Sequence, residues 1–203
     1  MPNRISGSNR IPGTKSILLL TLAGLISGFL SVAAGNMHSF ASGNDAIALV
    51  YKGLLFGFCV SACFVLFERV RAIWRIAGFI VACVAADMAS FYVAQWVNSI
   101  NVSSPSDPMG LEMPVSMFLA AGFAGAFIIL GAGLLLFGPA GMNWKAFASV
   151  FLGGVAGALL GILGWRMDDT SVLFVAWQAG IALLLGLILA HERSRTAAEV
   201  RAL

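Results

Sequence analysis

Charged residues are scarce in this chain. Only 10% of its 203 residues are charged, 60% are hydrophobic, and the mean hydropathy is +0.93. Because soluble domains contain about 25% charged residues, this composition leaves little room for a soluble domain and indicates an integral membrane protein. The net charge of +3 could suit nucleic acid. Most of the positive charges, however, stand at the ends of apolar runs, where they orient membrane helices. We therefore expect a lipid bilayer as partner and no nucleic acid.

The motifs of common enzymes are also missing. The chain has no GxSxG elbow, no HExxH helix, no Walker loop and no GxGxxG fingerprint. Histidine occurs twice, at His38 and His191, which the topology below places on opposite sides of the membrane, so they cannot share one haem. The three cysteines stand inside apolar runs without a neighbouring histidine and are expected to pack rather than to form disulfides or bind metal: Cys59, Cys63 and Cys83. We expect no enzyme, no catalytic residue, no cofactor and no metal.

Six apolar runs make up most of the chain and predict an all-α, polytopic membrane protein with six transmembrane helices. Each run is long enough to cross a hydrocarbon core of about 30 Å at a rise of about 1.5 Å per residue. Residues 1–16 are expected to form an N-terminal tail, residues 17–190 a single transmembrane domain, and residues 191–203 a C-terminal tail. The predicted spans are residues 17–34, 46–67, 72–97, 114–137, 146–165 and 171–190.

The first run also has features of a cleaved signal peptide. A basic leader precedes it, and Ser31, Val32 and Ala33 near its end form a plausible cleavage signature. A similar glycine-rich run recurs later without a basic leader, so we expect the first run to be retained as a span.

Lysine and arginine fall unevenly on the two sides of this six-span map, and cytoplasmic loops carry the excess of positive charge. One side holds Arg166 alone, and Lys52 lies just inside the membrane. We therefore expect both termini in the cytoplasm. Because the tails are compact, we also expect a multi-pass protein of a bacterial inner membrane. The cytoplasmic side would collect Arg4, Arg10, Lys15, Arg69, Arg71, Arg75, Lys145, Arg193, Arg195 and Arg201.

The first and last helical hairpins resemble each other in sequence. Both begin with a glycine-rich span, GLISGFLSVAAG from Gly24 and GVAGALLGILG from Gly154. Both end in a Glu-Arg-x-Arg motif, at residues 68–71 and 192–195. An ancient duplication would produce this pattern, and transporters are often built from such repeats. The alternative is that any membrane hairpin needs small residues and a basic end.

Glycines recur at four-residue spacing in two of the spans, which puts them on one face of a helix. Small residues at this spacing let helix backbones approach closely in lipid. The faces could line a pore, join copies of the chain or other membrane subunits, or pack within the bundle. The expected packing glycines are Gly24 and Gly28 in the first span and Gly153, Gly157 and Gly161 in the fifth.

One acid, Asp87, stands near the middle of the third span. A charged group at that depth costs about 2.5–3.5 kcal/mol on insertion scales, so it needs a partner or a purpose. Lys52 lies at about the same distance from the turn at residues 68–72, so an antiparallel hairpin would bring the two charges level. Ser90 shares the Asp87 face of the helix, and Gln178 stands at a matching place in the sixth span.

Two interpretations of function remain open. In the first, the chain is a small transporter or channel subunit, and the ion or substrate pathway runs past Asp87, Lys52, Ser90 and Gln178. In the second, it is a non-catalytic subunit of a larger membrane complex that acts through glycine-faced helix contacts. The first predicts a polar cavity at the depth of Asp87, and the second predicts a dry core.

Overall fold

The computed structural model describes residues 13–41, 45–67, 70, 72–101, 115–138, 144–167 and 170–202. These residues form six α-helices, each long and apolar enough to cross a membrane. The fold class is thus all-α, as predicted, and six such helices indicate a multi-pass membrane protein. The helices are α1 (Gly13–Ala41), α2 (Asp45–Leu66), α3 (Ile73–Asn101), α4 (Val115–Phe137), α5 (Trp144–Arg166) and α6 (Thr170–Ala202).

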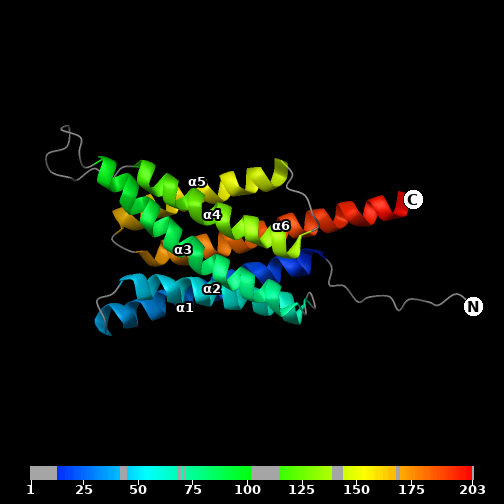
Figure 1. Cartoon of the computed structure of the whole chain (residues 1–203), viewed down its shortest axis with the longest axis horizontal. Coiled ribbons are helices and arrows are strands. Elements are labelled where there is room, and N and C mark those ends of the chain that lie inside the picture. Colours follow the sequence, from blue (N-terminus) through cyan, green and yellow to red (C-terminus); the bar gives the residue numbers. More distant parts are fainter. Residues whose placement is uncertain are drawn as a thin grey trace, which may run out of the picture.

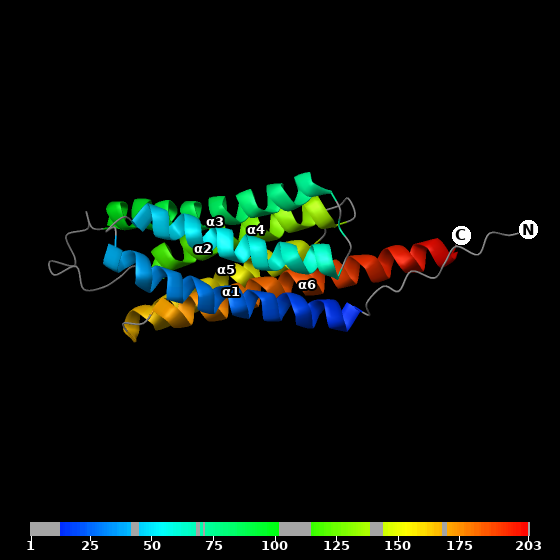
Figure 2. The same ribbon diagram turned by 90° about the horizontal axis from the view of Figure 1, so that it is seen from below.

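The helices run up and down in sequence order and close into a ring (Figures 1 and 2). Each helix packs against its neighbours in sequence, and α1 packs against α6 along the most extensive interface of the bundle. A smaller contact between α4 and α6 crosses the ring. Because the number of helices is even, α1 begins and α6 ends at the same end of the bundle, which we call the terminal end. The opposite end, where α3 ends and α4 begins, is called the α3–α4 end.

Several helices extend beyond the predicted spans. α1 continues to Ala41 through residues predicted to form a loop, and α6 continues to Ala202 through the charged C-terminal segment. A helix keeps its internal hydrogen bonds in water as well as in lipid, so the end of the apolar run does not end the helix. The segment after Ala190 is also rich in Ala, Glu and Arg, which favour helix. α4 ends at Phe137, the end of the fourth predicted span, and the sequence continues with Gly138 and Pro139, which do not favour a helix.

Other sequence predictions fall on residues outside the described part. Outside it lie parts of the two predicted tails and of the segments between the predicted spans: residues 1–12, 42–44, 102–114, 139–143, 168–169 and 203. Most of the first Glu-Arg-x-Arg motif, residues 68, 69 and 71, also lies outside it, as does the side chain of His38.

The outer surface of the ring is apolar and the core is closely packed, as expected of helices in lipid. Large exposed side chains occur on every helix, for example Leu18, Phe58, Val81, Leu135 and Leu187. Since lipid tails are as apolar as these side chains, such a surface is suited to the interior of a bilayer.

Three phenylalanines close the terminal end of the core. Phe64 of α2 stacks on Phe137 of α4 with ring centroids 4.0 Å apart. Phe79 of α3 meets both rings edge to face, at 6.1 Å from Phe64 and 5.4 Å from Phe137. Phe64 and Phe79 are fully buried, and aromatic pairs add about 0.5–1.5 kcal/mol each beyond the area that they bury. In the terminal half of the bundle, α2, α3 and α4 therefore pack through an aromatic cluster.

Candidate functional site

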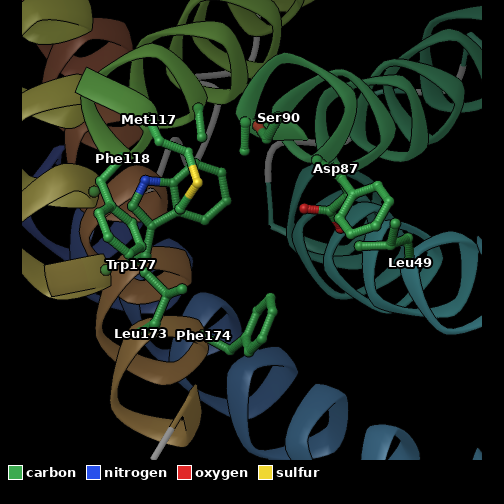
Figure 3. A pocket seen from close by; sticks show the side chains of 14 residues that line it. Leu49, Asp87, Ser90, Met117, Phe118, Leu173, Phe174 and Trp177 are labelled. Atoms are coloured by element: carbon green, nitrogen blue, oxygen red, sulfur yellow. The ribbon is translucent and has the colours of Figure 1, made fainter. Parts of the chain in front are cut away.

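A cavity of about 210 Å3 lies in the other half of the bundle, between five of the six helices. Leu49 of α2, Asp87 of α3, Met117 of α4 and Gly161 of α5 contribute to its wall, together with Phe174 of α6. Figure 3 shows the side chains of these helices around a common space. The lining residues of α4, α5 and α6 lie between the middle of the bundle and the α3–α4 end, so the cavity occupies this half of the bundle, with Asp87 at its inner limit on α3.

Asp87 stands at the midpoint of α3, which has 29 residues. Its side chain is 9% exposed and contributes to the cavity wall. Ser90 and Ala94, three and seven residues further on, line the same wall, as the helical spacing predicts. On the opposite side of α3, Val81 is 67% exposed and Tyr92 53% exposed. The acid thus faces into the bundle, and the bulky side chains face the lipid.

The charge of Lys52 reaches Asp87 across the hairpin of α2 and α3. Lys52 acts on the Asp87 carboxylate by a Coulombic interaction. Its ammonium nitrogen lies 3.7 Å from the centroid of the Phe174 ring of α6. Phe174 lines the cavity, whereas Lys52 is not among the lining residues. An aromatic face stabilises an ammonium, most strongly away from water.

Two polar atoms at the cavity wall have no hydrogen-bond partner among the described residues: Ser90 Oγ and Trp177 Nε1. Trp177 lies in a slot between glycines of α4 and α5. A methyl group added at Gly125 would lie 2.6 Å from Ser90 Oγ and 3.0 Å from the Trp177 ring. A methyl group added at Gly157 would lie 2.8 Å from Trp177 Nε1. These glycines therefore leave the room that Trp177 occupies beside the cavity.

Gln178 lies apart from this group. It is 1% exposed and is not part of the cavity lining. Ser27 Oγ of α1 donates a hydrogen bond of 2.7 Å to Gln178 Oε1, and Gln178 Nε2 donates one of 3.2 Å to Ser31 Oγ. Gln178 thus joins α6 to α1 in the core. The sequence analysis missed both serines, although their four-residue spacing inside an apolar run places them on the face of α1 that also carries Gly24 and Gly28.

The packing glycines lie at helix crossings inside the bundle. A methyl group at Gly24 would lie 2.5 Å from the Gln178 carbonyl oxygen, and one at Gly28 would lie 2.6 Å from Val175 Cα, both in the backbone of α6. On α5, Gly153 abuts Ile181 and Ala126, and Gly161 abuts Phe118. The backbones of α1 and α6 meet so closely because no side chain separates them at these positions.

The chemistry of the site is that of an apolar cavity with one carboxylate. Asp87 is the charged residue among the described residues of the lining. The described part of the chain contains no cluster of three His, Cys, Asp or Glu side chains that could hold a metal ion. The described cysteines are free, and Cys63 Sγ lies 3.6 Å from the Leu19 carbonyl oxygen. The arrangement can bind and orient a solute, and the lining offers no nucleophile activated by a base.

Comparison with protein-family models, curated proteins and solved structures gave no match for this chain.

Proposed function

We propose that the protein is a small membrane transporter whose solute passes through the cavity at Asp87. One observation carries this proposal: a cavity in the half of the bundle at the α3–α4 end has in its wall a carboxylate at the midpoint of α3. Charged side chains at this depth are costly, and they typically mark pathways for ions or substrates. A purely structural core would gain from replacing such a cavity with packed side chains.

The asymmetry of the bundle supports a transporter over an open channel. The Phe64, Phe79 and Phe137 cluster packs the terminal end, whereas the cavity occupies the α3–α4 end. Alternating access requires a site near the midplane that is reached from one side at a time. From the distribution of lysine and arginine, we further propose that the termini lie in the cytoplasm of a bacterial inner membrane and that the cavity faces outward.

The alternative, a non-catalytic subunit that docks through its glycines, has less support. Gly24 and Gly28 face α6, and Gly153, Gly157 and Gly161 face side chains of α4 and α6. These surfaces are used within the bundle and are not free to bind a second membrane protein. Assembly with copies of this chain would have to use other surfaces.

Cysteine accessibility tests the proposal without knowledge of the substrate. In a background with Cys59→Ala, Cys63→Ala and Cys83→Ala, a Ser90→Cys variant places one thiol at the cavity wall. A membrane-impermeant methanethiosulfonate with a trimethylammonium group is applied to right-side-out and to inverted vesicles. A transporter exposes the residue to each side in turn, so we expect labelling in both preparations, faster from the α3–α4 side.

Two matched variants control this experiment. Val81→Cys lies on the lipid-facing side of the same helix and should not react from either side. Lys145→Cys lies exposed near the terminal end and should react from one side only, which assigns the orientation. Labelling of Ser90→Cys from neither side would indicate a dry core, and labelling from the α3–α4 side alone would indicate a binding pocket without passage. Either result would overturn the transporter proposal.

A further inference from the structure

We propose that the cavity binds a small organic cation whose ammonium nitrogen is fully alkylated and carries an apolar group. This inference names the substrate class of the proposed transporter and rests on that proposal only for the passage of the cation, since binding is tested separately. It follows from the charge, the aromatic walls, the hydrogen-bonding capacity and the size of the cavity.

The charge of the site favours a cation. The carboxylate of Asp87 is 9% exposed at the midpoint of α3, and it belongs to the cavity wall. Bringing an anion next to it in a medium of low dielectric would be strongly repulsive. A neutral apolar solute would displace water from the carboxylate without replacing its stabilisation. A cation can displace this water and also stabilise the carboxylate.

Aromatic rings surround the space in front of Asp87. Phe91 of α3, Phe118 of α4, and Phe174 and Trp177 of α6 all line the cavity. Rings around a common space form the kind of site that binds alkylated ammonium groups. The protein itself provides an example, since the ammonium nitrogen of Lys52 lies 3.7 Å from the centroid of the Phe174 ring.

Hydrogen-bonding capacity decides between types of cation. Ser90 and Asp87 supply side-chain oxygen acceptors to the lining, whereas Trp177 Nε1 can only donate. A metal ion such as Ca2+ or Mg2+ takes about six or more oxygen ligands, which these two side chains do not supply. A primary ammonium has three N–H donors, which the three side-chain oxygens of Asp87 and Ser90 could accept, so the choice depends on the apolar and aromatic walls. A quaternary ammonium has none, and its methyl groups suit apolar and aromatic walls.

The volume limits the size of the ligand. An apolar cavity of about 150 Å3 holds one benzene molecule. The cavity here, at about 210 Å3, has room for an aromatic ring and a compact ammonium head. Benzyltrimethylammonium is therefore a suitable probe. Benzyl alcohol serves as its uncharged counterpart and benzoate as its anionic one.

Substitution of Lys52 should change the cation affinity in the direction opposite to substitution of Asp87. Its positive charge acts on Asp87, so it competes with a ligand cation for the same carboxylate. Removing Asp87 should weaken cation binding, whereas removing Lys52 should strengthen it. If the two charges were only a structural clasp, either substitution would leave the other charge unbalanced and neither would improve binding.

Isothermal titration calorimetry on the purified protein measures the affinities of the three probes. We expect the cation to bind and benzoate not to bind, with benzyl alcohol weaker than the cation by about tenfold or more. Asp87→Asn should remove this preference for the cation. Lys52→Met should increase cation affinity severalfold. Lys145→Met, which removes an equal charge at the terminal end, should leave the affinity unchanged.

Three outcomes would overturn the inference: equal affinity for the cation and benzyl alcohol, unchanged cation affinity in Asp87→Asn, or weakened affinity in Lys52→Met. If Asp87→Asn does not fold, the sign of the Lys52→Met effect still decides. Failure of the inference is distinguishable from failure of the transporter proposal. Labelling of Ser90→Cys from both sides without cation binding would leave a transporter of another solute, and cation binding with one-sided labelling would leave a receptor.

Discussion

The ammonium nitrogen of Lys52 lies 3.7 Å from the centroid of the Phe174 ring. This contact joins α2 to α6, which are not neighbours in the ring of helices, and it forms part of the boundary of the cavity. One face of the ring stabilises a charge of the protein, and Phe174 also belongs to the wall beside Asp87. The protein thus carries its own cation at the edge of the proposed cation site.

Replacing Phe174 by Leu should weaken the binding of benzyltrimethylammonium. The substitution keeps an apolar side chain but removes the aromatic face, whose interaction with a cation is worth about 0.5–2 kcal/mol, or roughly 2- to 30-fold in affinity. Calorimetry measures the change. Phe29→Leu, on the lipid-facing surface of α1, is the control and should bind as the unsubstituted protein does. Equal affinity in both variants would exclude Phe174 from the site.

Replacing Gly157 by Ala should destabilise the bundle and obstruct the cavity. The added methyl group would lie 2.8 Å from Trp177 Nε1 and 3.2 Å from Gly122 Cα, so Trp177 must move from its slot. Overpacking of this kind costs about 1–3 kcal/mol. Gly180→Ala is the matched control, because no atom lies within 4 Å of its added methyl group. Thermal unfolding in detergent should show a lower midpoint for the first variant only, and a loss in both would indicate a general intolerance of alanine.

Replacing Gly28 by Ala should separate α1 from α6. The methyl group would lie 2.6 Å from Val175 Cα and 3.2 Å from the Phe174 carbonyl oxygen. Both are backbone atoms, so the helices must move apart rather than a side chain turn away. We expect a larger loss of thermal stability than for Gly157→Ala, together with weaker cation binding because Phe174 is displaced. A variant as stable as the Gly131→Ala control, where the added methyl group meets nothing, would contradict the close approach of α1 and α6.

Replacing Gln178 by Leu should cost stability without changing the affinity for the cation. The substitution removes the hydrogen bonds to Ser27 and Ser31, and such bonds between membrane helices contribute about 0.6–2 kcal/mol. Gln178 does not line the cavity, so calorimetry should give the original affinity. A double-mutant cycle with Ser27→Ala measures the coupling directly. If the Gln178→Leu variant were as stable as the unsubstituted protein but bound the cation more weakly, Gln178 would belong to the pathway.

The sequence predicts the number of helices because the length and hydropathy of a membrane span reflect the thickness of the bilayer. It also predicts that Asp87 and Ser90 share one face of α3, since side-chain direction in a helix follows from spacing. It does not predict which side chains of the other helices lie opposite that face. That Gln178 belongs to the pathway with Asp87 stays a prediction. The hydrogen bonds of its side chain to Ser27 and Ser31 of α1 depend on how α6 packs against α1, which the sequence of either helix alone does not give.

The aromatic walls of the cavity could not be derived from the chain alone for a related reason. Phe118, Phe174 and Trp177 are three among many aromatic side chains in apolar runs, and any of them could have faced lipid. Trp177 turns inward because Gly125 and Gly157 leave a slot for its ring. The fit of the Trp177 ring into this slot depends on how α4, α5 and α6 are aligned with one another. The sequence of one helix does not determine that alignment.

Uptake of radiolabelled benzyltrimethylammonium into proteoliposomes tests the central claim most directly, since this permanently charged ion does not cross lipid unaided. An inside-negative potassium diffusion potential drives entry, and protein-free vesicles give the background. We predict uptake above background for the unsubstituted protein and for Lys145→Met, and background uptake for Asp87→Asn. Uptake by Asp87→Asn equal to that of the unsubstituted protein, or no uptake by the unsubstituted protein, would contradict transport of this cation through the cavity at Asp87.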